Sequence, residues 1–487
     1  GWDAADAIPE GFDVGGFLAV GERMPVMRSV EEAPSPDLLT GIDWTTEDGL
    51  SSAFTRRYGE DWRYCALWGK WLVWTGVRWN PDQVLYVSHL SRGICRNASL
   101  KAETPRLKGK LASSATISSV EKIARSDPKH ASTAEEWDAD VWALNTPGGV
   151  VDLRTGRMRP HRRDDRMTKV TTATPQGNPD SACPTWRGFL TDVTGGDADL
   201  MAYLQLMVGY CLTGVTSEHA LFFLYGTGAN GKSVFVNVLT TILGDYAANA
   251  PMDTFMEARN DRHPTDLAGL RGARFVSSIE TEQGRRWNES KVKAITGGDK
   301  VSARFMRQDF FEYLPQFKLV IAGNHKPSIR NVDEAMKRRL HLIPFTVTIP
   351  PERRDGRLTE KLLKERDGIL AWAVEGCSRW QSQGLKPPAS VVSATEEYFE
   401  AEDALGQWIE ERCLLAKSHR EGVSELFADW REWAERAGEY VGSVKRFSEL
   451  MATRKFDKCR LTGGARAIAG IALRPKPYSH AYPYRDD

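Results

Sequence analysis

One segment of this chain has the residue types and spacing of a phosphate-binding loop. Residues Gly226 to Ser233 read G-T-G-A-N-G-K-S and fit G-x-x-x-x-G-K-[ST], with an apolar run at 221–225 before them and an amphipathic run at 234–243 after them. A strand, a glycine-rich loop and a helix in this order direct backbone N–H groups and a helix N-terminus at phosphate oxygens. Lys232 is then expected to reach the β- and γ-phosphates, while the Ser233 hydroxyl coordinates Mg²⁺. The sequence therefore predicts a nucleoside triphosphate site rather than a glycine-rich turn that matches by chance.

The expected nucleotide contacts run from the first glycine into the helix. They are Gly226, Thr227, Gly228, Ala229, Asn230, Gly231, Lys232, Ser233 and Val234. Backbone N–H groups of such a loop enclose the phosphates, so even its apolar members count as candidate contacts.

Acidic and amide side chains follow two later apolar runs. Glu280 and Glu282 end the run that starts at Ala273, and Asn324 ends the run that starts at Phe317. Carboxylates in this position hold the water shell of Mg²⁺ and polarise the attacking water, a role we assign first to Glu280 and second to Glu282. Ligands bind at the carboxyl ends of parallel strands, so Asn324 is placed to orient that water. Taken singly, these residues also suit capping, and their order after a phosphate loop favours catalysis.

Two basic segments complete this region. Basic and aromatic residues flank the pair Gly297-Gly298, which suits a hairpin that contacts a phosphodiester backbone, and equally an exposed hairpin without a ligand. The pair Arg338-Arg339 precedes the apolar run 342–345. An arginine beyond the third strand could act in trans on the γ-phosphate of a neighbouring subunit, or could be the basic end of a surface helix.

Composition excludes several classes of protein. The 487 residues predict two to four domains, and Lys plus Arg equals Asp plus Glu at 65 each, so any nucleic-acid surface must be local. Seven cysteines without a C-x-x-C pair argue against zinc and against a disulfide framework. No apolar run reaches membrane-span length, and no signal peptide is visible, so we expect a cytoplasmic protein without a membrane partner. The opening residues from Gly1 read as mid-protein sequence, which predicts a fragment of a longer chain.

The region before the phosphate loop offers two weaker signals. An alternating segment predicts a hairpin whose aromatic residues either stack on bases or, as we favour, fill a small core: Trp68, Trp71, Trp74 and Trp79. Two or three helices are expected over 84–137, with basic residues interleaved: Arg92, Arg96, Lys101, Arg106, Lys108 and Lys110. A solvated helix surface is the default explanation for them, and a functional basic face is the alternative.

Together these segments resemble the superfamily 3 helicases, a branch of the AAA+ ATPases. The nearer resemblance is to the phage and plasmid primase–helicases related to the poxvirus primase–helicase. It rests on the G-x-x-x-N-G-K-S loop, the acid-ended strand at Glu280, the segment from Lys293 to Arg304, the strand before Asn324 and the pair 338–339.

The resemblance implies ATP hydrolysis with Mg²⁺ at the subunit interfaces of a hexameric ring that translocates on single-stranded or forked DNA, usually 3′ to 5′. It implies Arg339 as the finger in preference to Arg338. It also implies a central-channel DNA hairpin whose candidate contacts are Lys300, Arg304, Phe305, Met306 and Arg307. Many members place two adjacent acids after the second strand, whereas Thr281 separates Glu280 from Glu282, so the division of labour between these acids stays open.

The expected fold is α/β: an AAA+ P-loop core with a mostly helical N-terminal region and a C-terminal winged-helix-like domain. The expected segments are 1–48, a tail of an upstream primase module and a linker; 49–215, a region with a helical collar; 216–348, the ATPase core; 349–402, lid-side helices; 403–475, the winged-helix-like domain; and 476–487, a flexible tail. The helix 445–454 would be the recognition helix if this domain binds DNA, and a purely protein-binding role is equally compatible.

Three functions compete. The first is an ATP-driven DNA helicase that replicates a phage, plasmid or other mobile element in a bacterial cytoplasm, with an upstream primase module or replication proteins as partners. The second is an origin-binding or loader ATPase that assembles on DNA without unwinding it. The third, a small-molecule P-loop kinase, is disfavoured because nothing downstream reads as a substrate lid.

Overall fold

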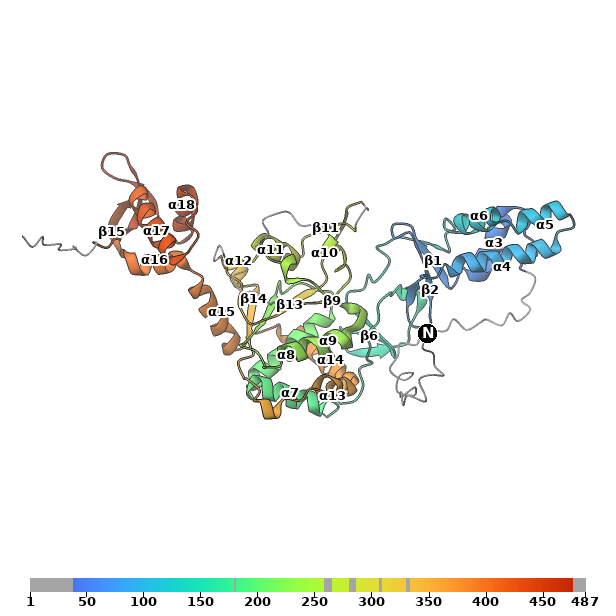
Figure 1. The fold of residues 1–487 in the computed structure, drawn as a ribbon, viewed down its shortest axis with the longest axis horizontal. Coiled ribbons are helices and arrows are strands. Elements are labelled where there is room, and N and C mark those ends of the chain that lie inside the picture. The colour runs from blue at the N-terminus through green and yellow to red at the C-terminus, as the bar shows by residue number, and fades with distance from the viewer. Residues whose placement is uncertain are drawn as a thin grey trace, which may run out of the picture. The chain divides into compact units, whose positions relative to one another are not determined.

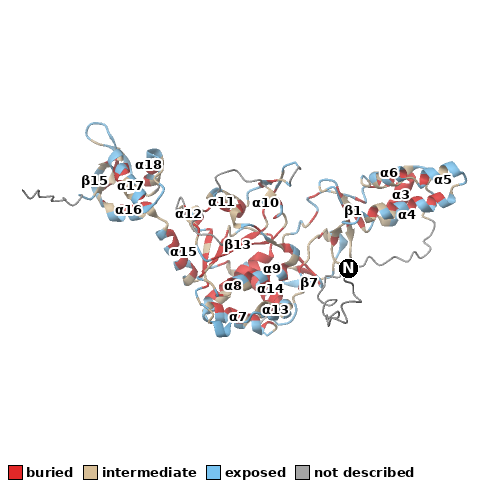
Figure 2. Ribbon diagram, in the orientation of Figure 1, coloured by how far each residue is buried: buried red, intermediate tan, exposed pale blue. Residues whose placement is uncertain are grey.

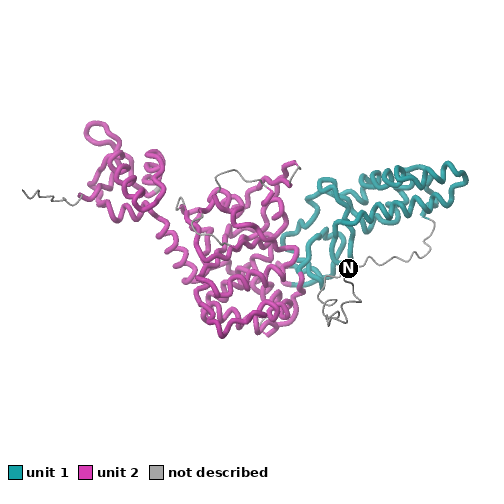
Figure 3. The backbone as a smooth tube through the Cα atoms, in the orientation of Figure 1, with its two compact units in different colours: residues 1–152, 157–171 teal, residues 153–156, 172–487 magenta. Residues whose placement is uncertain are grey.

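The computed structural model describes residues 38–178, 181–257, 265–279, 286–305, 309–329 and 333–475 (Figure 1). The chain forms two compact units, coloured separately in Figure 3. Unit 1 comprises the described residues up to 152 together with 157–171, and unit 2 comprises 153–156 and the described residues from 172 onward. The helical segment before the phosphate loop folds with unit 2, on the far side of the boundary predicted at residue 215.

Four helices form one part of unit 1. They are α3 Glu47–Tyr58, α4 Tyr86–Lys101, α5 Pro105–Leu111 and α6 Ser114–Ala124. Three of them begin at a side-chain cap, since the hydroxyls of Thr46, Thr104 and Ser113 accept hydrogen bonds from first-turn N–H groups. The helices share one apolar core that includes Phe54 and Ile94. The helices predicted in this region are thus confirmed.

Short sheets form the remainder of unit 1. One has the order β3-β2-β1-β4 and contains β1 Trp62–Cys65, β2 Lys70–Trp74, β3 Trp79–Pro81 and β4 Ala131–Ser132; the other contains β5 Ala143–Thr146, β6 Gly149–Asp152 and β7 Arg157–Arg159. The predicted hairpin is confirmed by the antiparallel pairing of Trp74 with Trp79. Trp71 and Trp79 are buried, and Trp68 and Trp74 are half-buried against the same core as Trp79. The core interpretation is therefore confirmed for the two buried rings, which have no face open to a base.

The described end of the predicted N-terminal linker also belongs to unit 1. Leu39 is buried, and Leu38, Ile42 and Trp44 cover the helical core. The residues just before them, 31–36, are rich in Pro and Glu, a composition that predicts a linker. The interpretation of residues 38–46 as linker is wrong.

A five-stranded parallel sheet forms the centre of unit 2. In spatial order its strands are β14 Leu340–Pro344, β8 Leu221–Tyr225, β13 Lys318–Gly323, β10 Phe275–Ile279 and β9 Ala247–Asn249. Every neighbouring pair is parallel. β8, β10 and β13 are almost entirely buried, as expected of parallel strands. The carboxyl ends of all five strands share one edge, and the predicted α/β class is confirmed.

Helices and a small hairpin surround this sheet. The helices are α7 Pro184–Thr194, α8 Ala198–Leu212, α9 Lys232–Leu243, α10 Thr265–Ala268, α11 Glu289–Gly297, α12 Glu334–Lys337, α13 Leu358–Lys364, α14 Arg366–Gln383 and α15 Ala389–Ala401; the hairpin is β11 Val301–Ala303 with β12 Phe311–Tyr313. α8 and α14 are in backbone contact, because a Cβ on Gly209 would lie 2.1 Å from the nitrogen of Cys377. This contact explains why α8 folds with unit 2.

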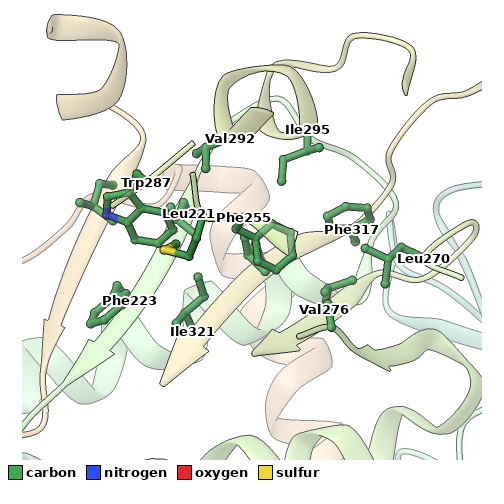
Figure 4. Packing of buried hydrophobic residues seen from close by; sticks show 14 of the residues in the cluster. Leu221, Phe223, Phe255, Leu270, Val276, Trp287, Val292, Ile295, Phe317 and Ile321 are labelled. Carbon is green, nitrogen blue, oxygen red and sulfur yellow. The ribbon is translucent and has the colours of Figure 1, made fainter. Parts of the chain in front are cut away.

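Apolar side chains from three strands fix the sheet to its surroundings (Figure 4). Phe223, Val276 and Ile321 are fully buried, and the ring of Trp287 meets Phe223 edge to face at 6.1 Å. Burial of each such side chain contributes about 1.5–3 kcal/mol. The buried residues of unit 2 are coloured red in Figure 2. The strand ends, where ligands bind in parallel sheets, are therefore held by a continuous core.

The end of unit 2 is a small module with its own core. It contains α16 Ala404–Arg412, β15 Cys413–Gly422, α17 Val423–Ala437, α18 Val444–Thr453, β16 Lys458–Arg460 and β17 Arg466–Leu473, with sheet order β15-β17-β16. Buried Asp429 accepts hydrogen bonds from Trp408 Nε1 at 2.9 Å and from Arg412 Nη2 at 2.7 Å. The helix predicted at 445–454 is confirmed by α18, and the winged-helix assignment of the module stays a prediction.

Candidate nucleotide-binding site

The phosphate loop, residues 226–233, connects the carboxyl end of β8 to α9 in close contact with its surroundings. A Cβ on Gly226 would lie 2.0 Å from the carbonyl oxygen of Phe345, so no larger residue fits there. Gly231 has φ +82° and a Cβ there would lie 2.5 Å from Val193 Cγ1. These two glycines are required by space and by backbone conformation.

Lys232 points back into the loop instead of into solvent. Its side chain is buried at 6% exposure, and its Nζ donates to the carbonyl oxygen of Gly226 at 2.8 Å. The same nitrogen donates to Oδ1 of Asn230 at 2.9 Å and to Oδ1 of Asn324 at 3.2 Å. Burial lowers the pKa of Lys232 from its ordinary value. Three oxygen acceptors thus hold the amine at the centre of the loop.

Asn230 has a second contact that sequence reasoning did not reveal. Its Nδ2 donates to the carbonyl oxygen of Phe345 at 2.7 Å, and the side chain is buried. Phe345 directly follows β14, and its own N–H donates to the carbonyl oxygen of Tyr225 at 2.8 Å. Asn230 therefore fixes Lys232 relative to two strands, in addition to its predicted place in the phosphate loop.

The first turn of α9 is open to an anion. Gly231 is its N-cap residue and provides no side-chain hydrogen bond. The first N–H groups of a helix without such a cap are donors for phosphate oxygens, and the helix dipole favours negative charge there. Ser233 is exposed in this turn and Val234 is half-buried. The tight glycine turn, the central amine and the exposed hydroxyl fit a nucleoside triphosphate with Mg²⁺.

The end of β13 lies beside the phosphate loop, as the strand order requires. Gly323 pairs with Tyr225, so Asn324 emerges next to Gly226. Lys326, which sequence reasoning missed, places its Nζ 4.2 Å from the ring centre of Tyr225. Burial lowers its pKa, opposed by the charge of Glu397. The only sequence signal for Lys326 was its place two residues after Asn324.

The predicted acids Glu280 and Glu282 lie outside the described residues. The strand before them, β10, ends at Ile279, which pairs with Ala322 of β13. The catalytic roles of the two acids therefore stay predictions from the sequence.

The predicted arginines lie at the other end of the sheet. Leu340 pairs with Leu221 at the amino ends of β14 and β8, and the N–H of Leu221 donates to the carbonyl oxygen of Arg339 at 2.7 Å. Gly226 is five residues further along β8, which corresponds to about 16 Å of strand. The structure therefore does not bring Arg338 or Arg339 to the phosphate loop of its own chain.

The two arginines differ in exposure. Arg339 is buried at 8% exposure, with Nε donating to Thr296 Oγ1 at 3.2 Å and Nη1 donating to the carbonyl oxygen of Ala335 at 2.8 Å. Burial, assisted by the charge of Arg338, lowers the pKa of Arg339. Arg338 is exposed. Of the pair, only Arg338 presents its guanidinium to solvent.

A hairpin lies where the sequence predicts one, its DNA contact stays a prediction, and its turn needs one correction. β11 and β12 pair antiparallel, but the pair Gly297-Gly298 ends α11, with Gly298 in the left-handed conformation at φ +81°, and does not form the hairpin turn. The described flanks expose Phe305 at 44% and Phe310 at 59%, and the guanidinium of Arg304 lies 4.7 Å from the ring centre of Phe310. Lys300 is exposed. The predicted contacts at Met306 and Arg307 lie outside the described residues.

Two family profiles match the chain. Residues 51–195 match the family described as "D5 N terminal like", and residues 224–339 match a family of unknown function, DUF5906. A candidate helicase of Acanthamoeba polyphaga mimivirus is 26% identical over an alignment of 336 positions that covers 64% of this chain and 35% of that protein. A candidate helicase of Frog virus 3 is 26% identical over an alignment of 256 positions that covers 48% of this chain and 26% of that protein. The chain is thus similar to the D5 N-terminal-like family over residues 51–195 and to viral proteins named as helicases over longer alignments.

The chain spans about a third of the mimivirus relative and about a quarter of the frog virus relative. Among solved structures, the apo form of the NrS-1 C-terminal region is similar at a TM-score of 0.46 and 11% identity, over 84% of this chain and 96% of that one. Within the described ranges, no helix is both long and apolar enough to cross a bilayer.

Proposed function

We propose that this chain is an ATP-dependent DNA helicase of the superfamily 3 class with an AAA+ core, which translocates on single-stranded DNA during replication of a mobile element. The observation that carries the proposal is the position of Lys232, held by oxygen atoms of Gly226, Asn230 and Asn324 at the carboxyl edge of a parallel sheet. An amine in a glycine-rich loop at this edge is the arrangement that binds β- and γ-phosphates.

The residues around the phosphate loop then have separate tasks. Lys232 would exchange its oxygen partners for phosphate oxygens, and the Ser233 hydroxyl, with Glu280 through water, would hold Mg²⁺. The metal, when bound, offsets negative charge on the phosphates. Release of Asn324 by Lys232 frees its carboxamide to orient the attacking water, which Glu280 or Glu282 polarises. Lys326 adds positive charge beside Tyr225.

The charge that completes this site comes from a neighbouring subunit in the proposed mechanism. The separation of about 16 Å along β8 prevents Arg338 from serving its own phosphate loop. Its exposure supports a contact with the next protomer of a ring, and we assign the finger to Arg338 in place of Arg339. Arg339, bonded to Thr296, is then a positioning residue.

The β11–β12 hairpin is the proposed DNA contact in the ring channel. Its exposed rings Phe305 and Phe310 can stack on bases or sugars, and Arg304 and Lys300 supply positive charge. Met306 and Arg307 keep the roles predicted from the sequence. Phe305→Ala should lower unwinding while ATP hydrolysis without DNA is retained.

A forked-DNA unwinding assay tests the proposal. Purified chain with ATP and Mg²⁺ should displace a labelled strand, hydrolyse ATP faster when single-stranded DNA is added, and lose both activities in Lys232→Ala. Hydrolysis and DNA binding without strand displacement would instead identify an origin-binding or loader ATPase. Hydrolysis that DNA does not stimulate would contradict both readings and favour a small-molecule kinase.

A further inference from the structure

Helices α4 and α5 of unit 1 form a strongly basic surface in a chain of zero net charge. Between residues 87 and 111 there are six basic residues and one acidic residue, Glu103. The six are Arg92, Arg96, Lys101, Arg106, Lys108 and Lys110, and all are exposed. In the whole chain the two classes are equal at 65 each. The local excess of positive charge is thus concentrated on two consecutive helices.

The exposed residues of α4 lie on one face. His89, Arg92, Arg96 and Leu100 are exposed and follow spacings of three and four, whereas Ile94 and its buried neighbours point into the helical core. Leu100 is 75% exposed in this row. This face of α4 is therefore available to a partner.

α5 contacts the edge of α4 that adjoins this exposed face. The hydroxyl of Ser99 donates to the carbonyl oxygen of Lys108 at 3.1 Å. Ser99 is three residues from Arg96 and seven from Arg92, so the flank of α4 that contacts α5 adjoins these arginines. We call the exposed basic residues of the two helices together the α4–α5 surface.

The packing of unit 1 does not explain why two positions within these helices are glycine. A Cβ added to Gly93 or Gly109 would have no heavy atom within 4 Å. Glycine in a helix interior is less favourable than alanine, and here neither close packing nor a positive φ compensates. Both glycines lie among the cations, next to Arg92 and Lys108. A flat strip between positive charges permits close approach of another backbone.

We propose that the α4–α5 surface binds the phosphodiester backbone of duplex DNA, which rests on the proposed function as a DNA helicase. The one Phe, Trp or Tyr of α4 and α5 is Tyr86, which packs against the helical core and stacks on Trp62. Single-stranded DNA is usually bound by aromatic side chains that stack on its bases, whereas a smooth row of Lys and Arg contacts the backbone of a duplex. The surface would therefore hold the double-stranded arm of a forked substrate.

A charge-matched pair of triple variants of the full chain tests this inference. The α4–α5 variant carries Arg96→Gln, Lys108→Gln and Lys110→Gln; the control carries Lys70→Gln, Lys122→Gln and Arg162→Gln, which are exposed cations elsewhere in unit 1. Fluorescence anisotropy with blunt duplex DNA should show binding about tenfold weaker for the α4–α5 variant, and a salt dependence shallower by about two to three in log–log slope. The control should bind as wild type.

Gly93 provides an independent variant. Gly93→Ala should raise the melting temperature, because space and helix propensity both allow it, and should bind duplex DNA nearly as wild type. Gly93→Leu should fold equally well but weaken duplex binding severalfold, because it fills the strip between the cations.

Equal losses in the two triple variants, or an unchanged affinity and salt slope in the α4–α5 variant, would refute the inference. Loss of binding to phosphatidylserine vesicles with duplex binding intact would show a lipid surface instead. ATP hydrolysis without DNA should be the same in both triple variants. Failure of the proposed function would appear separately, as hydrolysis that survives Lys232→Ala or as absent strand displacement in the wild type.

Discussion

The Nζ atom of Lys232 lies 3.2 Å from Oδ1 of Asn324, although 92 residues separate them in the chain. The contact joins the first residue of α9 to the end of β13 and exists because β8 and β13 are adjacent parallel strands. It places two predicted site residues, chosen for different reasons, in one hydrogen-bonded group. We expect substitution of either residue to lower nucleotide hydrolysis.

Replacement of Lys232 by alanine should abolish nucleotide hydrolysis. The amine is the only side-chain cation in the phosphate loop, and loss of such a contact to a developing negative charge lowers turnover by roughly two orders of magnitude or more. Loss of the amine leaves the carbonyl oxygen of Gly226 without this donor, which costs about 1–3 kcal/mol. This cost is small enough that the chain should remain folded. Phosphate release and thermal unfolding measure the two effects. Normal turnover in a folded variant would contradict the phosphate-loop assignment.

Asn230→Ala should reduce nucleotide affinity and stability together. The carboxamide bonds both Lys232 and the carbonyl oxygen of Phe345, so its loss leaves one buried acceptor unpaired and frees the amine. We expect about 1–3 kcal/mol less stability and clearly weaker binding of a fluorescent ATP analogue.

Asn324→Ala is the matched comparison for Asn230→Ala. Asn324 is exposed, so stability should change little, while hydrolysis falls and nucleotide binding persists. A result in which the two variants behave alike would contradict the separate roles given to these residues.

Strand identities in the sheet could be predicted from the sequence, whereas contacts across it could not. The apolar runs before Gly226, Glu280 and Asn324 gave β8, β10 and β13, because buried parallel strands are continuous hydrophobic segments. β9 was missed, since its three residues are small and mostly half-exposed. The bond from Asn230 to Phe345 depends on which strand lies next to β8, information that no local pattern carries.

Solvent exposure in the structure distinguishes side chains whose roles the sequence could not tell apart. Arg338 and Arg339 are adjacent and of the same type, so only the resemblance favoured one of them. Arg339 is the buried one, and its Nε donates to the hydroxyl of Thr296, which lies 43 residues earlier in the chain. The sequence likewise cannot show whether the tryptophans near Trp79 stack on bases or fill a core, because both roles are served by the same residue type.

Stability should fall in mild acid because of His341. Its ring accepts or donates a 2.7 Å hydrogen bond with Tyr203, and burial lowers its pKa from 6.5 to about 4. The unfolded state therefore binds more protons than the folded state between pH 6.5 and 4, so the free energy of unfolding falls as pH falls through this window. Partial exposure of His341 limits the effect to about 1–2 kcal/mol. Urea unfolding of wild type and His341→Asn at several pH values should show a weaker acid dependence in the variant.

Arg339→Ala should lower stability, whereas Arg338→Ala should leave it almost unchanged. Arg339 is buried and bonded to Thr296 and Ala335, so its loss leaves unpaired acceptors and a cavity and should cost about 1–3 kcal/mol in thermal or urea unfolding. Arg338 is exposed, and its loss should leave stability within about 0.5 kcal/mol. Hydrolysis should nevertheless fall strongly in Arg338→Ala while nucleotide binding is kept, because the proposed contact is with the γ-phosphate of a neighbour.

Mixed assemblies test whether Arg338 acts between subunits. A protomer with Arg338→Ala retains its phosphate loop, and a protomer with Lys232→Ala retains Arg338. Where the two are neighbours, half of the possible interfaces bring an intact phosphate loop together with an intact Arg338. Mixing the two inactive variants should therefore restore part of the hydrolysis, with the yield following the mixing ratio. Mixing Arg338→Ala with a double variant that carries both substitutions should restore none, since no protomer then supplies the arginine. Full hydrolysis by an isolated monomer would contradict an arginine in trans, because about 16 Å of β8 separate Arg338 from its own phosphate loop.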